Sequence, residues 1–507
     1  MSQIVQQGAI NTTALIVPDL YVQIVPPSLT LLNGVPTNIL GAVGSASWGP
    51  VNAPTICSSM ADYARSFGAL VARKYDMGTA VAVAALQGAN NFRCVRVTDG
   101  TDLAASVVAQ TNCITYTAKY SGTLGNFVQV TIGAGSKAST FRVTVALPGR
   151  VGEVFDNITG SGNALWVNIA AAINQGQSGI RGPSNIIVAS AGVGTTAPTL
   201  QTLTLAGGTD GAGVAGSNLI GADGTTRTGM YALRGTGSSI GMLADLDDPT
   251  TFTVQVAYGL SEGTYMIGTG PAGETITSAA TAKATAGIDT YAMKVLLGDW
   301  CYWADPVNGS TRLVSPQGFA AGRLANLVPQ QSGLNKPIYG IVATQRTLQN
   351  LTYATAELQA LGLAGIDLIT NPIPAGNQFG LRFGQNASSN ATINGDNYTR
   401  MTNYESATIG AGMGGFVGGL QSIKPNDPWR RGVKATLDSF LQAQVDQGQI
   451  DQFQVICDLT NNSPSRIALG YGQADVTIRY LSVVSKLLVN VQGGQSVTIS
   501  QVSVTPV

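Results

Sequence analysis

Both ends of this 507-residue chain are almost free of charge and rich in β-prone residues. From Met1 to Ala61 the only charged residue is Asp19, and no charged residue follows Lys486. An uncharged, β-prone terminus can pair with the open edge of a sheet, either in its own fold or in a neighbouring chain. Two such ends on one chain indicate a subunit that links to at least two neighbours.

The apolar residues of the two ends are the candidate linking residues. Apolar residues alternate with Ser, Thr and Gln from Gln495 to Val507, after the hinge-like pair Gly493-Gly494. The alternative is that this last segment is an internal strand of the chain's own fold. We predict instead that residues 1–30 and 491–507 are arms that pair with other subunits through Ile4, Val5, Leu15, Val17, Val497, Ile499, Val502 and Val504.

The charge content of the whole chain supports self-association. Charged residues make up 11% of the sequence and the net charge is zero, whereas soluble proteins carry about 25% charged residues. A surface with so few charges tends to associate, so we expect much of it to lie against other copies. The sequence has no basic excess, so no nucleic-acid partner is predicted.

No targeting or membrane segment is predicted. The sequence does not open with a cationic stretch followed by an apolar one, as a signal peptide does. Prolines interrupt the long uncharged run at the N-terminus, so it does not read as a membrane span. The five cysteines are scattered and odd in number, which is typical of reduced core residues in a protein made in a cytoplasm: Cys57, Cys94, Cys113, Cys301 and Cys457.

The order of the periodic segments predicts a multidomain chain of α/β and β type. Residues 31–100 and 213–375 show strands and helices that alternate as in a doubly wound sheet. Residues 101–212 show period-two alternation instead, and we predict an inserted β-sandwich there. Within 213–375 the predicted strands are Phe252–Ala257, Tyr265–Ile267, Trp300–Ala304, Ile338–Val342 and Ile366–Thr370, and the predicted helices are Phe319–Leu327 and Leu351–Leu361.

Residues 376–490 predict an α+β C-terminal domain. Asn426 or Asp427 caps a helix whose first turn holds Pro428 and which Gly448 ends. A polar, Asn-rich loop is predicted over 386–403. The apolar face of the helix is expected to comprise Val433, Leu437, Phe440, Leu441 and Val445, and three strands are predicted at Ile450–Asp458, Val476–Tyr480 and Leu487–Val491.

The sequence does not support catalysis, and we predict no catalytic residue, no cofactor and no metal ligand. The chain contains no histidine, which excludes Ser-His-Asp and Cys-His catalysis and the HExxH zinc site. The stretch 237–241 matches GxSxG in letters but has no base for its serine. The stretch 268–273 matches GxGxxG after a strand, but Pro271 removes an N–H that could face a phosphate. The acidic group at Asp245, Asp247 and Asp248 is typical of a solvated turn.

Three basic residues crowd the first turns of the C-terminal helix. Positive charges at that end oppose the helix dipole. They form either a solvated face or a docking patch for an acidic partner. The residues are Arg430, Arg431 and Lys434.

Six stretches, in this order, resemble the contractile tail sheath proteins of bacteriophages and related injection machines. Residues 376–419 match that family less clearly. The stretches are Gly41–Pro54 with its Ala-Ser-Trp-Gly-Pro-Val-Asn core, Ser58–Gly68, Phe92–Val97, Tyr120–Asn126, Leu205–Gly211, and Asp427–Asp458 followed by Asn461-Asn462.

The resemblance implies a fold and a function. It implies an N-terminal arm (1–30), an α/β segment (31–100), an inserted β-sandwich (101–212), a non-catalytic subtilisin-like domain (213–375), a C-terminal sheath domain (376–490) and a C-terminal arm (491–507). It also implies six-fold rings stacked around an inner tail tube, with a baseplate and a tail terminator as further partners and no membrane insertion. Such a sheath is assembled in the host cytoplasm, and its contraction drives the tube through the host envelope for genome delivery. A bacterial injection-system sheath and another self-assembling shell protein are the alternatives.

Overall fold

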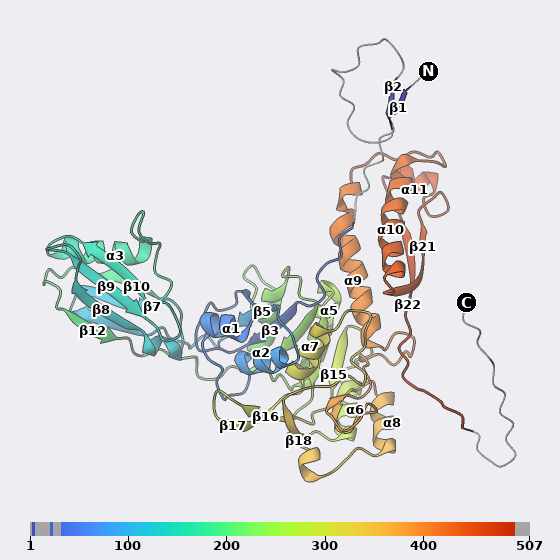
Figure 1. Cartoon of the computed structure of the whole chain (residues 1–507), viewed down its shortest axis with the longest axis horizontal. Coiled ribbons are helices and arrows are strands. Elements are labelled where there is room, and N and C mark those ends of the chain that lie inside the picture. Colours follow the sequence, from blue (N-terminus) through green and yellow to red (C-terminus); the bar gives the residue numbers. More distant parts are fainter. Residues whose placement is uncertain (1–2, 6–20, 24–31, 492–507) are drawn as a thin grey trace. The chain divides into compact units, whose positions relative to one another are not determined.

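The computed structural model of the chain describes residues 3–5, 21–23 and 32–491. The chain forms two compact units. Unit 1 comprises Met1–Thr37 and Arg400–Leu481, and unit 2 comprises Asn38–Thr399 with the segment from Ser482 onward. Figure 1 shows the elements of both units along the chain.

The centre of unit 2 is a six-stranded sheet. Its first five strands run parallel and its last pairs antiparallel. Strands β3, β13, β14 and β15 are buried along their whole length, because a parallel sheet is covered on both faces. The strand order is β15 (Met293–Leu296), β14 (Tyr265–Thr269), β13 (Ile240–Leu243), β3 (Leu40–Gly44), β5 (Phe92–Arg96) and β4 (Thr55–Cys57).

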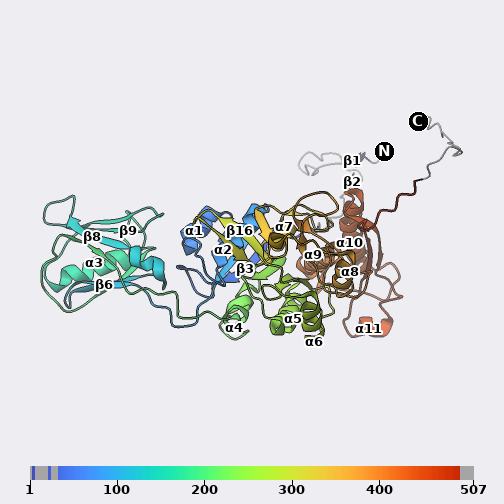
Figure 2. The same cartoon turned by 90° about the horizontal axis from the view of Figure 1, so that it is seen from below.

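Helices cover both faces of this sheet. Figure 2 shows β3 between a layer that contains α2 (Met77–Leu86) and α7 (Gln317–Asn326) and a layer that contains α5 (Phe252–Glu262) and α6 (Ile276–Thr285). Glycines bring α2 and α7 unusually close: a Cβ at Gly322 would lie 2.4 Å from Ala84. Each face has its own hydrophobic cluster, so the two faces of one sheet build two cores.

Two smaller antiparallel sheets complete the α/β part of unit 2. Strands β17 (Ser310–Val314), β16 (Cys301–Asp305) and β18 (Ile341–Thr344) form one, and β19 (Ile369–Thr370) pairs with β20 (Gly380–Leu381) in the other. The strand predicted at Trp300–Ala304 therefore exists, and that predicted at Ile338–Val342 begins only at Ile341; both lie outside the parallel sheet. Helix α8 (Thr355–Leu363) matches the predicted Leu351–Leu361 helix.

Residues 106–204 form two antiparallel sheets around a shared hydrophobic cluster. The period-two prediction is confirmed, since Val143 and Val145 of β9 are buried and alternate with less buried neighbours. Helix α3 (Asn163–Gln175) buries Leu165, Ile169 and Ile173. One sheet has the order β10 (Glu153–Ile158), β9 (Phe141–Ala146), β8 (Gln129–Ala134), β12 (Gln201–Thr204), and the other has β11 (Ile187–Ala191), β7 (Ile114–Ala118), β6 (Ser106–Gln110).

Unit 1 is an α+β body. Helix α10 (Pro428–Asp446) packs beside β21 (Ile450–Ile456), which pairs antiparallel with β22 (Asp475–Tyr480). Helix α9 (Asp396–Gly412) begins in unit 2 and ends in unit 1, and α11 (Pro464–Ala468) follows β21. The predicted cap is confirmed, because the Asp427 carboxylate accepts the Arg430 N–H and Pro428 is the first helical residue.

Three local predictions are wrong. Phe252–Ala257 is the start of α5 and not a strand, and its buried residues Phe252, Gln255 and Tyr258 have helical spacing. Part of the predicted loop 386–403 is helical, because α9 begins at Asp396. Leu487–Val491 is not a strand in the described structure and is exposed.

Residues 376–399, which the sequence grouped with the C-terminal domain, lie in unit 2.

The N-terminal arm contains a short parallel pair. Strand β1 (Gln3–Val5) pairs with β2 (Tyr21–Gln23), with Ile4 opposite Val22. Ile4 and Val5 therefore lie on a strand that pairs within the chain, and their pairing with other subunits stays a prediction. The other predicted arm residues, Leu15, Val17, Val497, Ile499, Val502 and Val504, lie outside the described residues. Over the described ranges, no helix is both long and apolar enough to cross a bilayer.

Candidate assembly site

The two-stranded sheet of unit 1 is the candidate docking site for arms. In the part of the chain that the structure describes, β21 and β22 pair only with each other, so each strand keeps one open edge. An isolated pair of strands is only marginally stable, and here α10 supports one face. Side chains of β22 alternate between half-buried Val476, Ile478 and Tyr480 and exposed neighbours. Added strands could bond to either edge through the backbone.

The residues that follow β22 are unusually apolar for an exposed segment. Between Leu481 and Val491 no regular structure forms among the described residues. The large apolar side chains there are exposed: Leu481, Val483, Val484, Leu487, Leu488, Val489 and Val491. Such a stretch is a typical site of association with another protein surface.

The three basic residues at the start of α10 have different environments. Arg430 is 2% exposed, and its guanidinium donates to the carbonyl of Ser422 at 2.8 Å and to that of Lys424. Lys434 is half-buried; its ammonium donates to the Val455 carbonyl at 2.6 Å and lies 3.3 Å from Asp438. Arg431 is exposed. A solvent-facing patch at this site therefore consists of Arg431 and part of Lys434, and the sequence interpretation of Arg430 as a surface residue needs correction.

The spacing of the sequence contained a signal for this burial. Buried Arg430, Val433, Leu437, Leu441 and Gln444 recur at intervals of three or four, so Arg430 and Gln444 extend the apolar stripe of α10 at both ends. A charged or amide side chain on such a stripe is expected to bury its stem and satisfy its polar atoms locally.

Four stretches that carry the family resemblance meet at one joint in unit 2. The Ser47 carbonyl accepts the Leu124 N–H at 3.1 Å. The buried Arg96 guanidinium donates to the carbonyls of Gly49 and Ser121, each at 2.8 Å. Close approach of the backbone explains one glycine: Gly122 has φ 123°, and a Cβ there would lie 2.1 Å from the Ser47 oxygen.

The fourth stretch, Leu205–Gly211, closes the joint. Asn126 donates to the Gly208 carbonyl at 2.9 Å and accepts the Gly208 N–H at 2.7 Å. The Asp210 carboxylate accepts the Thr123 N–H at 2.7 Å and pairs with Arg73 at 2.7 Å. We call the contacts of these stretches the motif joint. The polar side chains at these positions therefore form hydrogen bonds between segments of the chain, and no ligand is needed to account for them.

Asp99 holds the two ends of the 101–212 insertion together. Its carboxylate accepts the N–H of Thr101 at 3.0 Å, of Ala212 at 2.9 Å and of Gly213 at 2.8 Å. These hydrogen bonds, first that of Thr101, lower the pKa of Asp99 to about 2. The interaction is therefore complete above the ordinary carboxyl pKa and is lost only as the pH falls through about 2.

The two enzyme-like motifs have non-catalytic geometry. Ser239 precedes strand β13, whereas a nucleophile elbow places its serine between a strand and a following helix; its hydroxyl donates to the Ile39 carbonyl at 3.0 Å. In the second motif, a Cβ at Gly270 would lie 1.9 Å from the Glu274 carboxylate. That carboxylate accepts the Gly298 N–H at 3.2 Å, so an acidic group lies at the loop that would face a phosphate.

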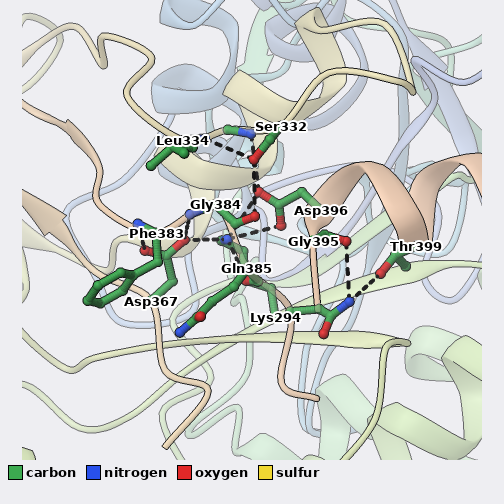
Figure 3. A network of polar contacts seen from close by, with 12 residues as sticks. Lys294, Ser332, Leu334, Asp367, Phe383, Gly384, Gln385, Gly395, Asp396 and Thr399 are labelled. Atoms are coloured by element: carbon green, nitrogen blue, oxygen red, sulfur yellow. Dashed lines mark hydrogen bonds and ion pairs between the residues drawn. The ribbon is translucent and has the colours of Figure 1, made fainter. Parts of the chain in front are cut away.

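A buried polar network joins the sheet of unit 2 to the start of α9 (Figure 3). Lys294 of β15 lies 2.6 Å from Asp367 and 3.0 Å from Asp396, and none of the three side chains is exposed. Burial acts to lower the pKa of Lys294, but the two carboxylates outweigh it and raise that pKa. The lysine therefore stays charged, as a structural ion rather than a base.

Backbone and hydroxyl groups satisfy the rest of this network. Asp367 accepts the N–H groups of Leu368, Phe383 and Gly384 at 2.8 to 2.9 Å. Asp396 accepts the Tyr265 hydroxyl at 2.7 Å. Sequence reasoning missed these residues because they come from distant segments. Among the described residues, no group of three or more acidic, cysteine or histidine side chains could hold a metal ion.

No protein-family model and no curated protein matches the sequence. Solved structures do match in fold. The sheath tail protein of Listeria innocua has a TM-score of 0.59 and 14% identity, covering 89% of this chain and 96% of its own. The sheath tail protein of Desulfitobacterium hafniense has a TM-score of 0.56 and 15% identity, covering 86% and 93%. The PVC sheath of an extracellular contractile injection system, in its contracted state, has a TM-score of 0.52 and 12% identity, covering 96% and 99%. The chain thus has the mixed α/β multidomain fold of sheath tail proteins.

Proposed function

We propose that the chain is the structural subunit of a contractile tail sheath. The observation that carries the proposal is the fold likeness to sheath tail proteins over 86% or more of the chain, both units included. The sparse charge of the sequence supports it, because subunits of a lattice place much of their surface against other copies.

In this proposal the subunits form six-fold rings stacked helically around an inner tube. The arms, 1–30 and 491–507, add strands to the open edges of the β21–β22 sheets of neighbouring subunits. Backbone hydrogen bonds would then keep the lattice connected while the subunits rotate and repack on contraction. Arg431 and Lys434, with buried Arg430 fixing the helix start, would face an acidic patch of the tube.

The finer parts of the proposal follow from the family resemblance. Baseplate and tail terminator proteins would be further partners, and the sheath would be assembled in the host cytoplasm as part of a virion. Contraction would drive the tube through the host envelope for genome delivery. Residues 213–375 would be subtilisin-like in fold only, and the protein would have no enzymatic role.

A sheath of a bacterial injection system is the second candidate. The likeness to the contracted PVC sheath of an extracellular contractile injection system supports it. The contents of the native particles separate the two: nuclease-protected DNA in particles that carry this subunit supports a virus, and particles without DNA support an injection system.

Electron microscopy of the purified protein tests the proposal. The full chain, concentrated alone or with its inner tube, is expected to form hollow tubes with helical striation and six-fold symmetry in cross-section. Monomers or irregular aggregates in the presence of the tube would overturn the assignment. Closed shells would favour another self-assembling protein instead.

A further inference from the structure

A carboxylic side chain lies between the two long helices of unit 1. Glu405 of α9 is 4% exposed, and Gln444 of α10 is 3% exposed. The Gln444 amide nitrogen lies 3.3 Å from one carboxylate oxygen of Glu405, Oε2. The other carboxylate oxygen and the Gln444 carbonyl oxygen are both buried and have no hydrogen-bond partner in the described structure.

The unpaired atoms are both acceptors when Glu405 is ionised. Two acceptors cannot satisfy each other, and a buried acceptor without a donor is destabilising. One added proton on Glu405 changes this, since a carboxylic acid has one donor and an amide has one acceptor and two donors. The acid and the amide can then form a cyclic pair, in which each group both donates and accepts.

Among the described residues, burial and the Gln444 amide are the influences on the Glu405 carboxylate, and no ion pair with it is present. On α9, Tyr404 is adjacent, and burial together with the Glu405 charge raises the pKa of its hydroxyl, which keeps it neutral. Arg400 is directed to the Thr37 carbonyl, 3.5 Å away. On α10, Lys434 pairs with Asp438, and Asp446 accepts from Gln442. On β22, the Tyr480 hydroxyl lies 3.2 Å from that of Thr402 on α9.

We propose that Glu405 and Gln444 form a proton-dependent clasp between α9 and α10. The clasp is closed when Glu405 is protonated and its O–H donates to the Gln444 carbonyl. Loss of the proton leaves a buried carboxylate held by one long hydrogen bond. This inference concerns the unit that carries the β21–β22 sheet, and it stands independently of the proposed sheath function.

The direction of the pH dependence follows from burial. Burial raises the pKa of Glu405 from 4.5 to about 7, against a smaller opposing effect of the Gln444 amide. In the unfolded chain the group ionises near its ordinary pKa, so between about 4.5 and 7 the folded state binds more protons. The clasp therefore stabilises unit 1 most at low pH, and this stabilisation decreases as the pH rises through that window.

Hydrogen exchange of the full chain, followed by mass spectrometry on peptides from α9 and α10, tests the clasp. After correction for intrinsic exchange rates, protection of these peptides is expected to fall by at least about tenfold from pH 5.5 to pH 8.0. In Glu405→Gln, two neutral amides face each other, and the pH dependence is expected to disappear. The control Asp451→Asn removes an exposed carboxylate of the same unit and should keep the wild-type dependence.

A second variant keeps the test decisive if Glu405→Gln does not fold. Gln444→Met removes the carbonyl that accepts from protonated Glu405, so the protection gained at pH 5.5 is expected to be smaller than in the wild type. Equal protection of the wild type at both pH values would overturn the proposal. So would an unchanged pH dependence in Glu405→Gln, or a gain of protection at pH 5.5 in Gln444→Met that equals that of the wild type.

Discussion

The ammonium of Lys294 and the carboxylate of Asp396 lie 3.0 Å apart although 102 residues separate them in the sequence, and neither is exposed. Lys294 belongs to the central sheet, and Asp396 is the first residue of α9. The contact therefore holds the first residue of α9 against β15, the edge strand of the central sheet.

Replacing Lys294 by methionine is expected to destabilise unit 2 strongly. The variant leaves Asp367 and Asp396 buried without a counter-ion, which costs about 3–5 kcal/mol for a broken buried pair. Urea unfolding followed by circular dichroism measures the change. Lys74→Met is the matched control, because Lys74 is half exposed beside Asp247 and its loss should cost only about 0–1 kcal/mol. Equal effects of the two variants would contradict the structural role of Lys294.

Deleting residues 101–212 is expected to leave a folded protein. The ends of the deletion lie together, since the Asp99 carboxylate is 2.8 Å from the Gly213 N–H. Circular dichroism and a cooperative thermal transition of the shortened chain check this, and tube formation checks whether assembly persists. Deleting only 163–175 is the control: it removes α3 from its hydrophobic cluster and should cause aggregation. A shortened chain that is unfolded would show that the insertion is required for the fold of the rest.

The basic residues of α10 are expected to separate into two classes. Arg430→Ala removes a buried group that donates to two carbonyls, and a loss of about 1–3 kcal/mol in the free energy of unfolding is expected. Arg431→Glu with Lys434→Glu should leave the fold intact but weaken assembly around purified inner tubes, most at low ionic strength. Tube-guided assembly that is unchanged at low and at physiological salt would show that the two residues form a solvated face.

Removing residues 495–507, or residues 1–19, is expected to give a folded protein that cannot form long tubes. Each truncation removes strand-forming residues that we assign to linkage between subunits. Light scattering and electron microscopy measure assembly, and circular dichroism measures folding. In the full chain, Val497→Asp with Ile499→Asp should act like the C-terminal truncation, whereas Thr498→Asp, on the other face of an alternating strand, should act less. Unfolding on truncation would identify the tail as an internal strand.

Local signals in the sequence predicted the elements that local chemistry determines. The Asp427 cap and the Pro428 start are visible in a few residues, and the structure confirms both. The α5 helix was missed because Phe252, Val254 and Val256 alternate like a strand, although the buried residues Phe252, Gln255 and Tyr258 have helical spacing. The start of α9 was missed because its polar, Asn-rich lead-in is typical of a loop.

The candidate sites were harder to predict because their partners are distant in sequence. The buried network forms only after the central sheet, the loop between β20 and α9, and α9 itself have folded. Only then do the side chains of Lys294, Asp367 and Asp396 come together. Glu405 and Gln444 meet only when two helices pack. The motif joint was predicted in part. The family resemblance pointed to its stretches, but only the structure shows that they form hydrogen bonds with one another.

The strand order of the central sheet has a consequence for synthesis on the ribosome. Strand β3 lies between β5 and β13, and the whole insertion is translated between those two strands. Until Ile240–Leu243 emerges, β3 lacks one neighbour, while the sheets between residues 106 and 204 already have all their strands. Strands β13 to β15 are therefore added to the sheet after the insertion has folded, and until then the hydrophobic core around β3 is incomplete. For a protein with so few charges, that waiting period is when the nascent chain most needs protection from aggregation.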